Sequence, residues 1–143
     1  MSISVIDERS ALDDLLSSCH GAIYAYGVIA AYLSDPDEAL SAMASFRIQR
    51  DQLLTSFQEL GYPAPPASAA YSLGTPVVDE PSARVAAAIL EEAGVAHWAN
   101  ALFYLPSQIK QRECEFLQAC AVRSFGWSGI AKAFSSADKS SKL

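Results

Sequence analysis

The sequence predicts an all-α protein built as a bundle of four helices. Apolar residues recur at intervals of three and four along four long segments, and no segment shows the alternation of a strand. Five of the seven prolines fall together between residues 62 and 81. The 143 residues suit one domain. We expect residues 10–127 to form the bundle, residues 1–9 an N-terminal extension and residues 128–143 a tail.

The first helix is expected to begin at Ser10, because Ser10 and Asp13 have the spacing of a capping box. Residues 15–34 carry no formal charge and are long enough to cross a membrane. Internal serines and acidic residues on both flanks favour instead the central helix of a bundle, outside any membrane. Its expected apolar positions are Leu12, Leu15, Leu16, Cys19, Ile23, Tyr26, Ile29, Ala30 and Leu33.

The second helix has the clearest boundaries. Asp35 is a good N-cap, Pro36 suits a first turn, and Gly61 supplies the C-terminal stop. Arg47 and Arg50 interrupt an otherwise apolar stripe that we expect to consist of Leu40, Met43, Phe46, Leu53, Leu54, Phe57 and Leu60.

The stretch from residue 62 to 81 is predicted to be a linker, because proline removes backbone donors and blocks helix continuation. Fully extended, its 20 residues could span roughly 65 Å. A third helix is expected over residues 82–105, ended by Pro106. A fourth is expected over residues 107–124, ended by the glycines at 126 and 129. Two tightly joined helix pairs with a long Pro-rich crossover between helices 2 and 3 form the ferritin-like arrangement.

A ferritin-like bundle raises the question of a di-metal site. Such a site takes a Glu from each of two helices and a Glu-x-x-His pair from each of the other two. Neither His20 nor His97 has a Glu three residues before it, and only Glu91 and Glu92 resemble ligands. We therefore expect no metal, no cofactor and no catalytic residue.

Arg47 and Arg50 are the most informative polar residues. Because an isolated buried charge is expensive, buried arginines must be paired. One interpretation is a buried polar network in the place of the metal. In the other, only the stems are covered and the guanidinium groups reach water. Both remain open for the candidate network, which consists of Arg47, Arg50, Asp51, Glu91, Glu92, His20 and His97.

Several segments resemble an actinobacterial ferritin-like family that is known only as a domain of unknown function. The resemblance covers roughly residues 10–127 and implies a ferritin-like fold without an established activity. Where the family usually has Glu before the first-helix histidine, this chain has Cys19. The matching segments are residues 19–27 (CHGAIYAYG), Arg47-x-x-Arg50-Asp51, the linker with Ala69-Ala70-Tyr71 and Pro76-Val77, and Leu90-Glu91-Glu92 followed by Trp98.

Net charge, cysteine count and the sequences of the two ends limit the expected partners and location of the protein. A net charge of −6 argues against nucleic-acid binding. Three cysteines, an odd number, argue for reduced thiols. With no signal-peptide pattern at the N-terminus, we expect a cytoplasmic protein. The final Ser-Lys-Leu matches a peroxisomal address in a eukaryote and also arises by chance in a Ser- and Lys-rich tail.

We expect a non-catalytic bundle that acts by binding or self-association, with a protein or small-molecule partner that the sequence does not identify. A homodimer would explain aromatic residues beyond the needs of one small core: Tyr62, Tyr71, Trp98, Phe103, Tyr104 and Trp127. The alternative is a metal-dependent oxidoreductase or metal-binding protein with a degenerate di-iron-type site at His20, Glu91, Glu92 and His97.

Overall fold

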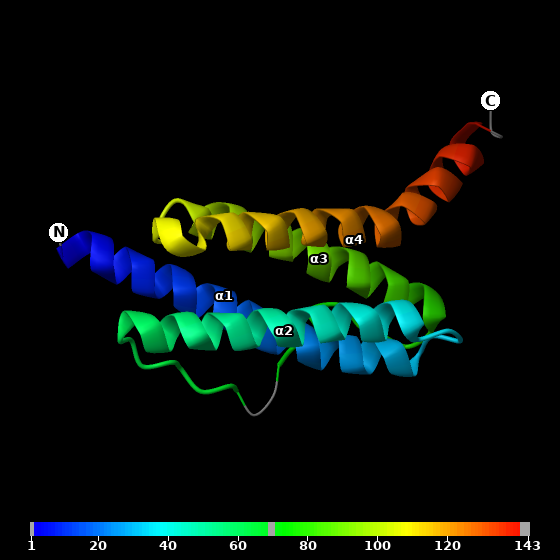
Figure 1. Cartoon of the computed structure of the whole chain (residues 1–143). Coiled ribbons are helices and arrows are strands. Elements are labelled where there is room, and N and C mark those ends of the chain that lie inside the picture. Colours follow the sequence, from blue (N-terminus) through cyan, green and yellow to red (C-terminus); the bar gives the residue numbers. More distant parts are fainter. Residues whose placement is uncertain (1, 69–70, 141–143) are drawn as a thin grey trace.

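The computed structural model describes residues 2–68 and 71–140, with side chains for residues 7–68 and 71–129. It contains α1 (Ser2–Ala31), α2 (Asp37–Leu60), α3 (Glu80–Leu102) and α4 (Ser107–Ser140), and no strand within these ranges. Figure 1 shows α1 and α2 as one antiparallel hairpin that packs against a second, formed by α3 and α4. The predicted all-α four-helix bundle is confirmed.

The two hairpins pack together mainly through α1 and α3, whereas α2 and α4 make few contacts with each other. In Figure 1, α2 ends and α3 begins at opposite ends of the bundle. Between these two helices, residues 61–68 and 71–79 form no helix or strand. None of the helices in the described part of the chain has a stretch long and apolar enough to cross a membrane.

The boundaries of α2 and α3 match the prediction in part. The N-cap of α2 is Pro36, and not Asp35 as expected, and it makes no side-chain capping bond. Asp35, one residue earlier, accepts a hydrogen bond from the backbone N–H of Asp37 at 3.1 Å. Gly61 ends α2 with φ of 75°, a conformation that favours glycine, as predicted. At the start of α3, Asp79 accepts from the Ser82 N–H at 2.9 Å, and the Ser82 hydroxyl accepts from the Asp79 N–H at 3.1 Å. This capping box places the start of α3 at Glu80 and not at Ser82.

The outer helix boundaries differ from the prediction. α1 begins at Ser2 and not at Ser10, so the proposed cap at Ser10 lies inside a helix. α4 continues through Gly126 and Gly129 to Ser140. A glycine costs a helix about 1 kcal/mol relative to alanine, which does not by itself end it. Between the two glycines, Trp127 is buried and packs against the ring of Tyr26.

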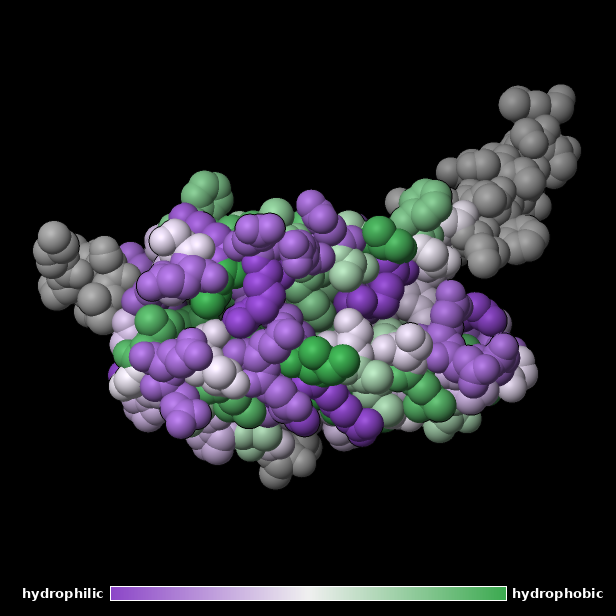
Figure 2. Space-filling model, viewed as in Figure 1, coloured by the Kyte–Doolittle hydropathy of each residue, from purple (hydrophilic) through white to green (hydrophobic). Residues whose placement is uncertain are grey.

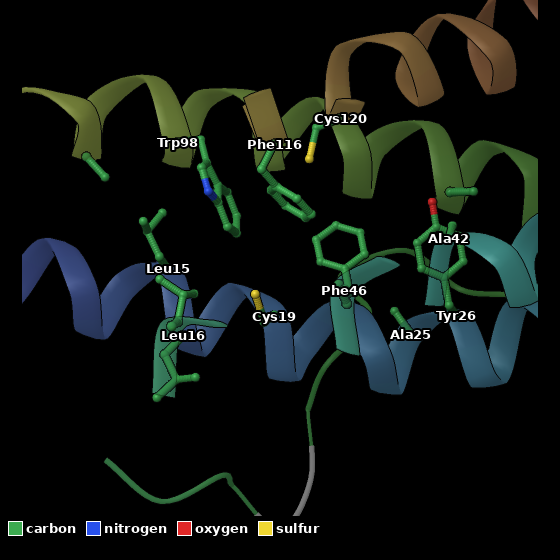
Figure 3. Packing of buried hydrophobic residues seen from close by; sticks show 14 of the residues in the cluster. Leu15, Leu16, Cys19, Ala25, Tyr26, Ala42, Phe46, Trp98, Phe116 and Cys120 are labelled. Atoms are coloured by element: carbon green, nitrogen blue, oxygen red, sulfur yellow. The ribbon is translucent and has the colours of Figure 1, made fainter. Parts of the chain in front are cut away.

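Aromatic rings fill the centre of the core (Figure 3). Phe116 of α4 lies 5.2 Å from the ring of Phe46 and 4.8 Å from that of Trp98, between centroids. Figure 3 shows Cys19 of α1 and Cys120 of α4 pointing into the space between their helices. The core thus joins all four helices.

Small residues carry much of the buried faces of α2 and α3, and this shifts both faces from their predicted positions. Leu40, expected in the core, is 42% exposed, while the neighbouring Ala39 is fully buried. The buried face of α2 consists of Ala39, Ala42, Phe46, Gln49, Leu53, Ser56 and Phe57. That of α3 consists of Ala83, Ala86, Ala87, Glu91, Gly94, Trp98 and Ala101. Neither Arg47 nor Arg50 belongs to the buried stripe.

Candidate functional site

Two glutamates lie in the interior with no exposed surface: Glu91 of α3 and Glu113 of α4. A buried carboxylate is strongly disfavoured unless hydrogen-bond donors and a cation compensate for its lost hydration. Each of the two has such partners, and in both cases an arginine of α4 supplies the positive charge.

Glu91 binds partners from α1 and α4 through a single oxygen. The Tyr26 hydroxyl donates to Oε1 at 2.5 Å, and Arg123 Nε donates to the same oxygen at 2.7 Å. Trp127 Nε1 in turn donates to the Tyr26 hydroxyl at 3.2 Å. The network therefore connects α1, α3 and α4.

The guanidinium group of Arg123 also contacts the aromatic core. Its central carbon lies 5.1 Å from the ring centroid of Phe46 and 5.5 Å from that of Phe116, within the range of cation–π attraction. Although burial alone would lower the pKa of Arg123, its hydrogen bond to Glu91 raises that pKa above the usual value. Arg123 therefore stays charged at neutral pH.

Glu113 has a parallel set of partners. Trp98 Nε1 donates to its Oε2 at 3.0 Å, and Gln49 Nε2 donates to the same oxygen. Arg112 Nη2 donates to Oε1 at 3.0 Å and to the Ser56 hydroxyl at 2.8 Å. This second network connects α2, α3 and α4.

The environment keeps the neighbouring groups protonated. Burial, followed by the nearby Glu91 carboxylate, raises the pKa of Cys120 to about 12. Burial, followed by Glu113, also raises the pKa of Cys19, and burial together with Glu91 raises that of Tyr26. A neutral thiol is a poor nucleophile, so neither buried cysteine is set up for chemistry at neutral pH.

Of the seven residues predicted to share a polar network, the structure places only Glu91 in the buried one. Arg47 and Glu92 are exposed. Arg50 pairs at 3.0 Å with Asp51 at the surface, where the two side chains are 30% and 66% exposed. Of the two interpretations left open for these arginines, the structure does not match the buried network with Glu91, and it agrees with the one in which their guanidinium groups reach water.

The two histidines lie apart from this network. His20 is half-buried, and burial, followed by Arg50, lowers its pKa. His97 is exposed and lines a pocket between α1 and α3.

The sequence does contain a signal for the residues that the prediction missed. Ile109, Phe116, Cys120 and Trp127 of α4 are buried at helical spacing, and Glu113 falls on the same face. Glu113 lies four residues after the buried Ile109 and three residues before the buried Phe116. A charged residue in phase with a buried stripe is a candidate for an interior ion pair, and Arg47 is out of phase with the stripe of α2. Arg50 has the same spacings from Phe46 and Leu53 but is 30% exposed, so spacing alone does not identify the interior charges.

The interior does not fit the di-metal centre that the ferritin-like resemblance implies. Such a centre needs carboxylates and histidines that converge on an open space. Here Arg112 and Arg123 form ion pairs with the two carboxylates, and Gln49 and Tyr26 donate hydrogen bonds to them. In the part of the chain described, no group of three or more His, Cys, Asp or Glu side chains gathers as metal ligands.

A separate pocket of about 230 Å³ lies between α1 and α3. Its floor includes Phe46 and Trp98, and residues 71–73 of the connection between α2 and α3 form part of its edge. Most of its lining is apolar, and Ser18, Ser72 and His97 are its polar side chains.

Comparisons with known proteins identify relatives without an assigned activity. A family described as a domain of unknown function (DUF4439) matches residues 11–138. A crystal structure of a conserved hypothetical protein from Mycobacterium tuberculosis superimposes with a TM-score of 0.84 at 26% sequence identity, covering 91% of this chain and 94% of that one. No protein with curated function matches the sequence.

Proposed function

The chain belongs to the family described as a domain of unknown function (DUF4439), and we propose that it is a non-catalytic binding protein with a ferritin-like arrangement of helices. The observation that carries this proposal is the pairing of each interior carboxylate with an arginine, Glu91 with Arg123 and Glu113 with Arg112.

The chemistry of these pairs supports a structural role for the interior. Each interior carboxylate accepts hydrogen bonds from an arginine and from a tyrosine or tryptophan. Such a carboxylate is a poor metal ligand, because a cation already lies beside it. We therefore propose that the chain acts by binding, either at its surface or in the pocket between α1 and α3.

Metal loading tests this proposal. The purified protein is incubated without oxygen with Fe²⁺, Mn²⁺ or Zn²⁺, freed of unbound ions by gel filtration, and analysed for metal content. We expect far less than one ion per chain, and the same trace amount in Glu91→Gln. One or more ions per chain that Glu91→Gln removes would overturn the proposal.

One observation favours the alternative of a degenerate metal site. The second oxygen of Glu91, Oε2, is buried without a hydrogen-bond partner among the described side chains. In that alternative, Glu91 would bind a metal together with His20, Glu92 or His97. The loading experiment separates the non-catalytic proposal from this alternative. If metal binds, a His97→Ala variant shows whether the pocket histidine is one of its ligands.

We also propose that the chain forms a weak homodimer in the cytoplasm, consistent with its three free cysteines. Phe103 and Phe125 support self-association, with exposures of 83% and 76%. Trp98 and Trp127, two of the aromatic residues from which we predicted the homodimer, are buried and cannot contribute to a contact between copies. Figure 2 shows hydrophobic side chains scattered among hydrophilic ones on the face in view.

Light scattering over a range of concentrations checks the dimer. The average mass should rise with concentration, and Phe103→Ser should reduce the rise. A mass that stays at 15.3 kDa throughout would remove self-association from the proposal.

A further inference from the structure

We infer that the pocket between α1 and α3 binds a small, uncharged, mostly apolar molecule that carries one hydrogen-bonding group. This inference rests on the proposed binding function and specifies the ligand class. It depends on the size of the pocket, on the residues that create the space, and on the charges that the lining lacks.

The volume limits the ligand to about one ring with a short substituent. The pocket measures about 230 Å³ and opens to solvent beside Ile89, Ala93 and His97, which are exposed. An enclosed apolar cavity of about 150 Å³ already holds benzene, so the volume suffices for one ring. Water against the apolar part of the lining finds few of the polar partners that bind it well. An apolar molecule therefore displaces poorly bound solvent when it enters.

Small side chains on facing helices create the space. Gly21, Ala22 and Ala25 line it from α1, and Ala93 and Gly94 line it from α3. A Cβ atom added to Gly21 would lie 3.7 Å from Cδ1 of Tyr71, an ordinary contact distance. The ring of Tyr71 thus lies directly over the small residues of α1 and closes one side of the pocket.

The chemistry of the lining selects an uncharged ligand. Among the residues that the structure describes, no Asp, Glu, Lys or Arg lines the pocket, so a charged ligand would lose hydration without gaining a counter-ion. His97 on α3, with Ser18 on α1 and Ser72 on the connecting segment, can each exchange one hydrogen bond with a ligand. A neutral hydroxyl on an aromatic ring matches this pattern.

Trp98 provides a local reporter for occupancy. It lines the pocket, and its Nε1 is fixed by the hydrogen bond to Glu113. The chain has only two tryptophans, so Trp127→Phe leaves Trp98 as the single indole.

Three probes of similar size test the ligand class: phenol, toluene and benzoate. Each is titrated into Trp127→Phe while Trp98 emission is followed, with excitation where the probes do not absorb, and affinities are measured by calorimetry. We expect phenol to bind saturably and most tightly, toluene next, and benzoate at least about tenfold more weakly because of its charge.

Two matched variants locate the binding. Ala93→Leu adds three carbons to a residue that lines the pocket, whereas Ala96→Leu adds them to an exposed position of the same helix outside it. Phenol affinity should fall at least about tenfold in Ala93→Leu, a loss that corresponds to filling part of the space. It should stay within about twofold in Ala96→Leu, which also shows that leucine itself is tolerated on α3.

The inference is overturned if none of the probes binds saturably to the folded protein, if benzoate binds as well as phenol, or if both leucine variants bind alike. None of these results would change the metal content measured in the loading experiment, which tests the non-catalytic function. A failure of the ligand assignment is therefore distinguishable from a failure of the proposed non-catalytic function.

Discussion

At the scale of single residues, the direction in which an arginine points decides how much its ion pair contributes to the free energy of unfolding. Arg50 and Arg123 both pair with a carboxylate, at 3.0 and 2.7 Å. The partner of Arg50 is largely in water, whereas that of Arg123 has no exposed surface. Surface pairs contribute about 0–1 kcal/mol, while removing one partner of a buried pair leaves an uncompensated charge.

Replacing these two arginines should therefore give very different results. Arg123→Leu should lower the free energy of unfolding by about 3–5 kcal/mol, because Glu91 is left without its cation. Arg50→Leu should change it by less than about 1 kcal/mol. Chemical denaturation measures both. A Glu91→Met/Arg123→Met double variant should regain much of the loss, and equal effects of the two single variants would contradict the assignment.

The three thiols should also differ in reactivity. Cys114 is exposed, whereas Cys19 and Cys120 are buried with raised pKa values, that of Cys120 at about 12. Alkylation of the native protein near pH 8 should modify Cys114 alone, and all three should react after unfolding. Peptide mass spectrometry assigns the sites. Rapid native labelling of Cys120 would show that the thiol is not held neutral in the interior.

At the scale of helices, small residues explain most differences between prediction and structure. Leucine, isoleucine, tyrosine and cysteine positions predicted much of the core face of α1, and Phe46, Leu53 and Phe57 of α2 are buried as expected. The buried face of α3 and the first turns of α2 consist largely of alanine and glycine, whereas Leu40, Val85 and Ile89 are substantially exposed. Hydrophobicity alone cannot reveal such faces, since small residues are buried by the close approach of helices and not by their own apolar area.

Two glycines provide opposite tests of helix energetics. Gly27 lies inside α1 with open space around its Cα, so Gly27→Ala should raise the free energy of unfolding by about 0.5–1 kcal/mol. Gly61 has equally open surroundings but φ of +75°, so Gly61→Ala should lower it by about 1–2 kcal/mol. Thermal unfolding of the two variants measures both signs. A stabilising Gly61→Ala would show that α2 does not end in the left-handed conformation.

At the scale of the whole molecule, a polar contact at one end ties the two hairpins together. Glu80, at the start of α3, accepts hydrogen bonds from the N–H and hydroxyl of Ser34, in the turn between α1 and α2, at 3.2 and 3.0 Å. These bonds lower the pKa of Glu80 below its usual value near 4.5. The capping bonds from Ser82 likewise lower the pKa of Asp79.

This contact predicts a particular loss of stability in acid. A carboxyl whose pKa is lower in the folded than in the unfolded state stabilises the fold above the unfolded pKa, and this contribution disappears as the pH falls through the folded pKa. The Tm of Glu80→Gln should thus lie below that of the unmodified chain at neutral pH, and the difference should shrink below about pH 4.5. A difference that stays constant with pH would exclude Glu80 as its source.

The class of fold follows from the sequence because long helical periodicities and the cluster of prolines are local signals. The interior network does not follow, because it joins residues far apart in the chain, such as Tyr26, Glu91 and Arg123. Glu91 was found because it and Glu92 are the carboxylates that resemble ligands of a di-metal site. Its true partner was missed because Arg123 comes just before the glycines at which α4 was expected to end.

The position of both arginines on α4 has a consequence for how the protein forms during its synthesis. α4 leaves the ribosome after α1, α2 and α3, and until it does, Glu91 on the completed α3 lacks the arginine with which it pairs. Closing α1, α2 and α3 around an unpaired carboxylate is unfavourable. The first three helices should therefore not close into a stable core before α4 emerges, and a chain truncated before residue 123 should be unfolded.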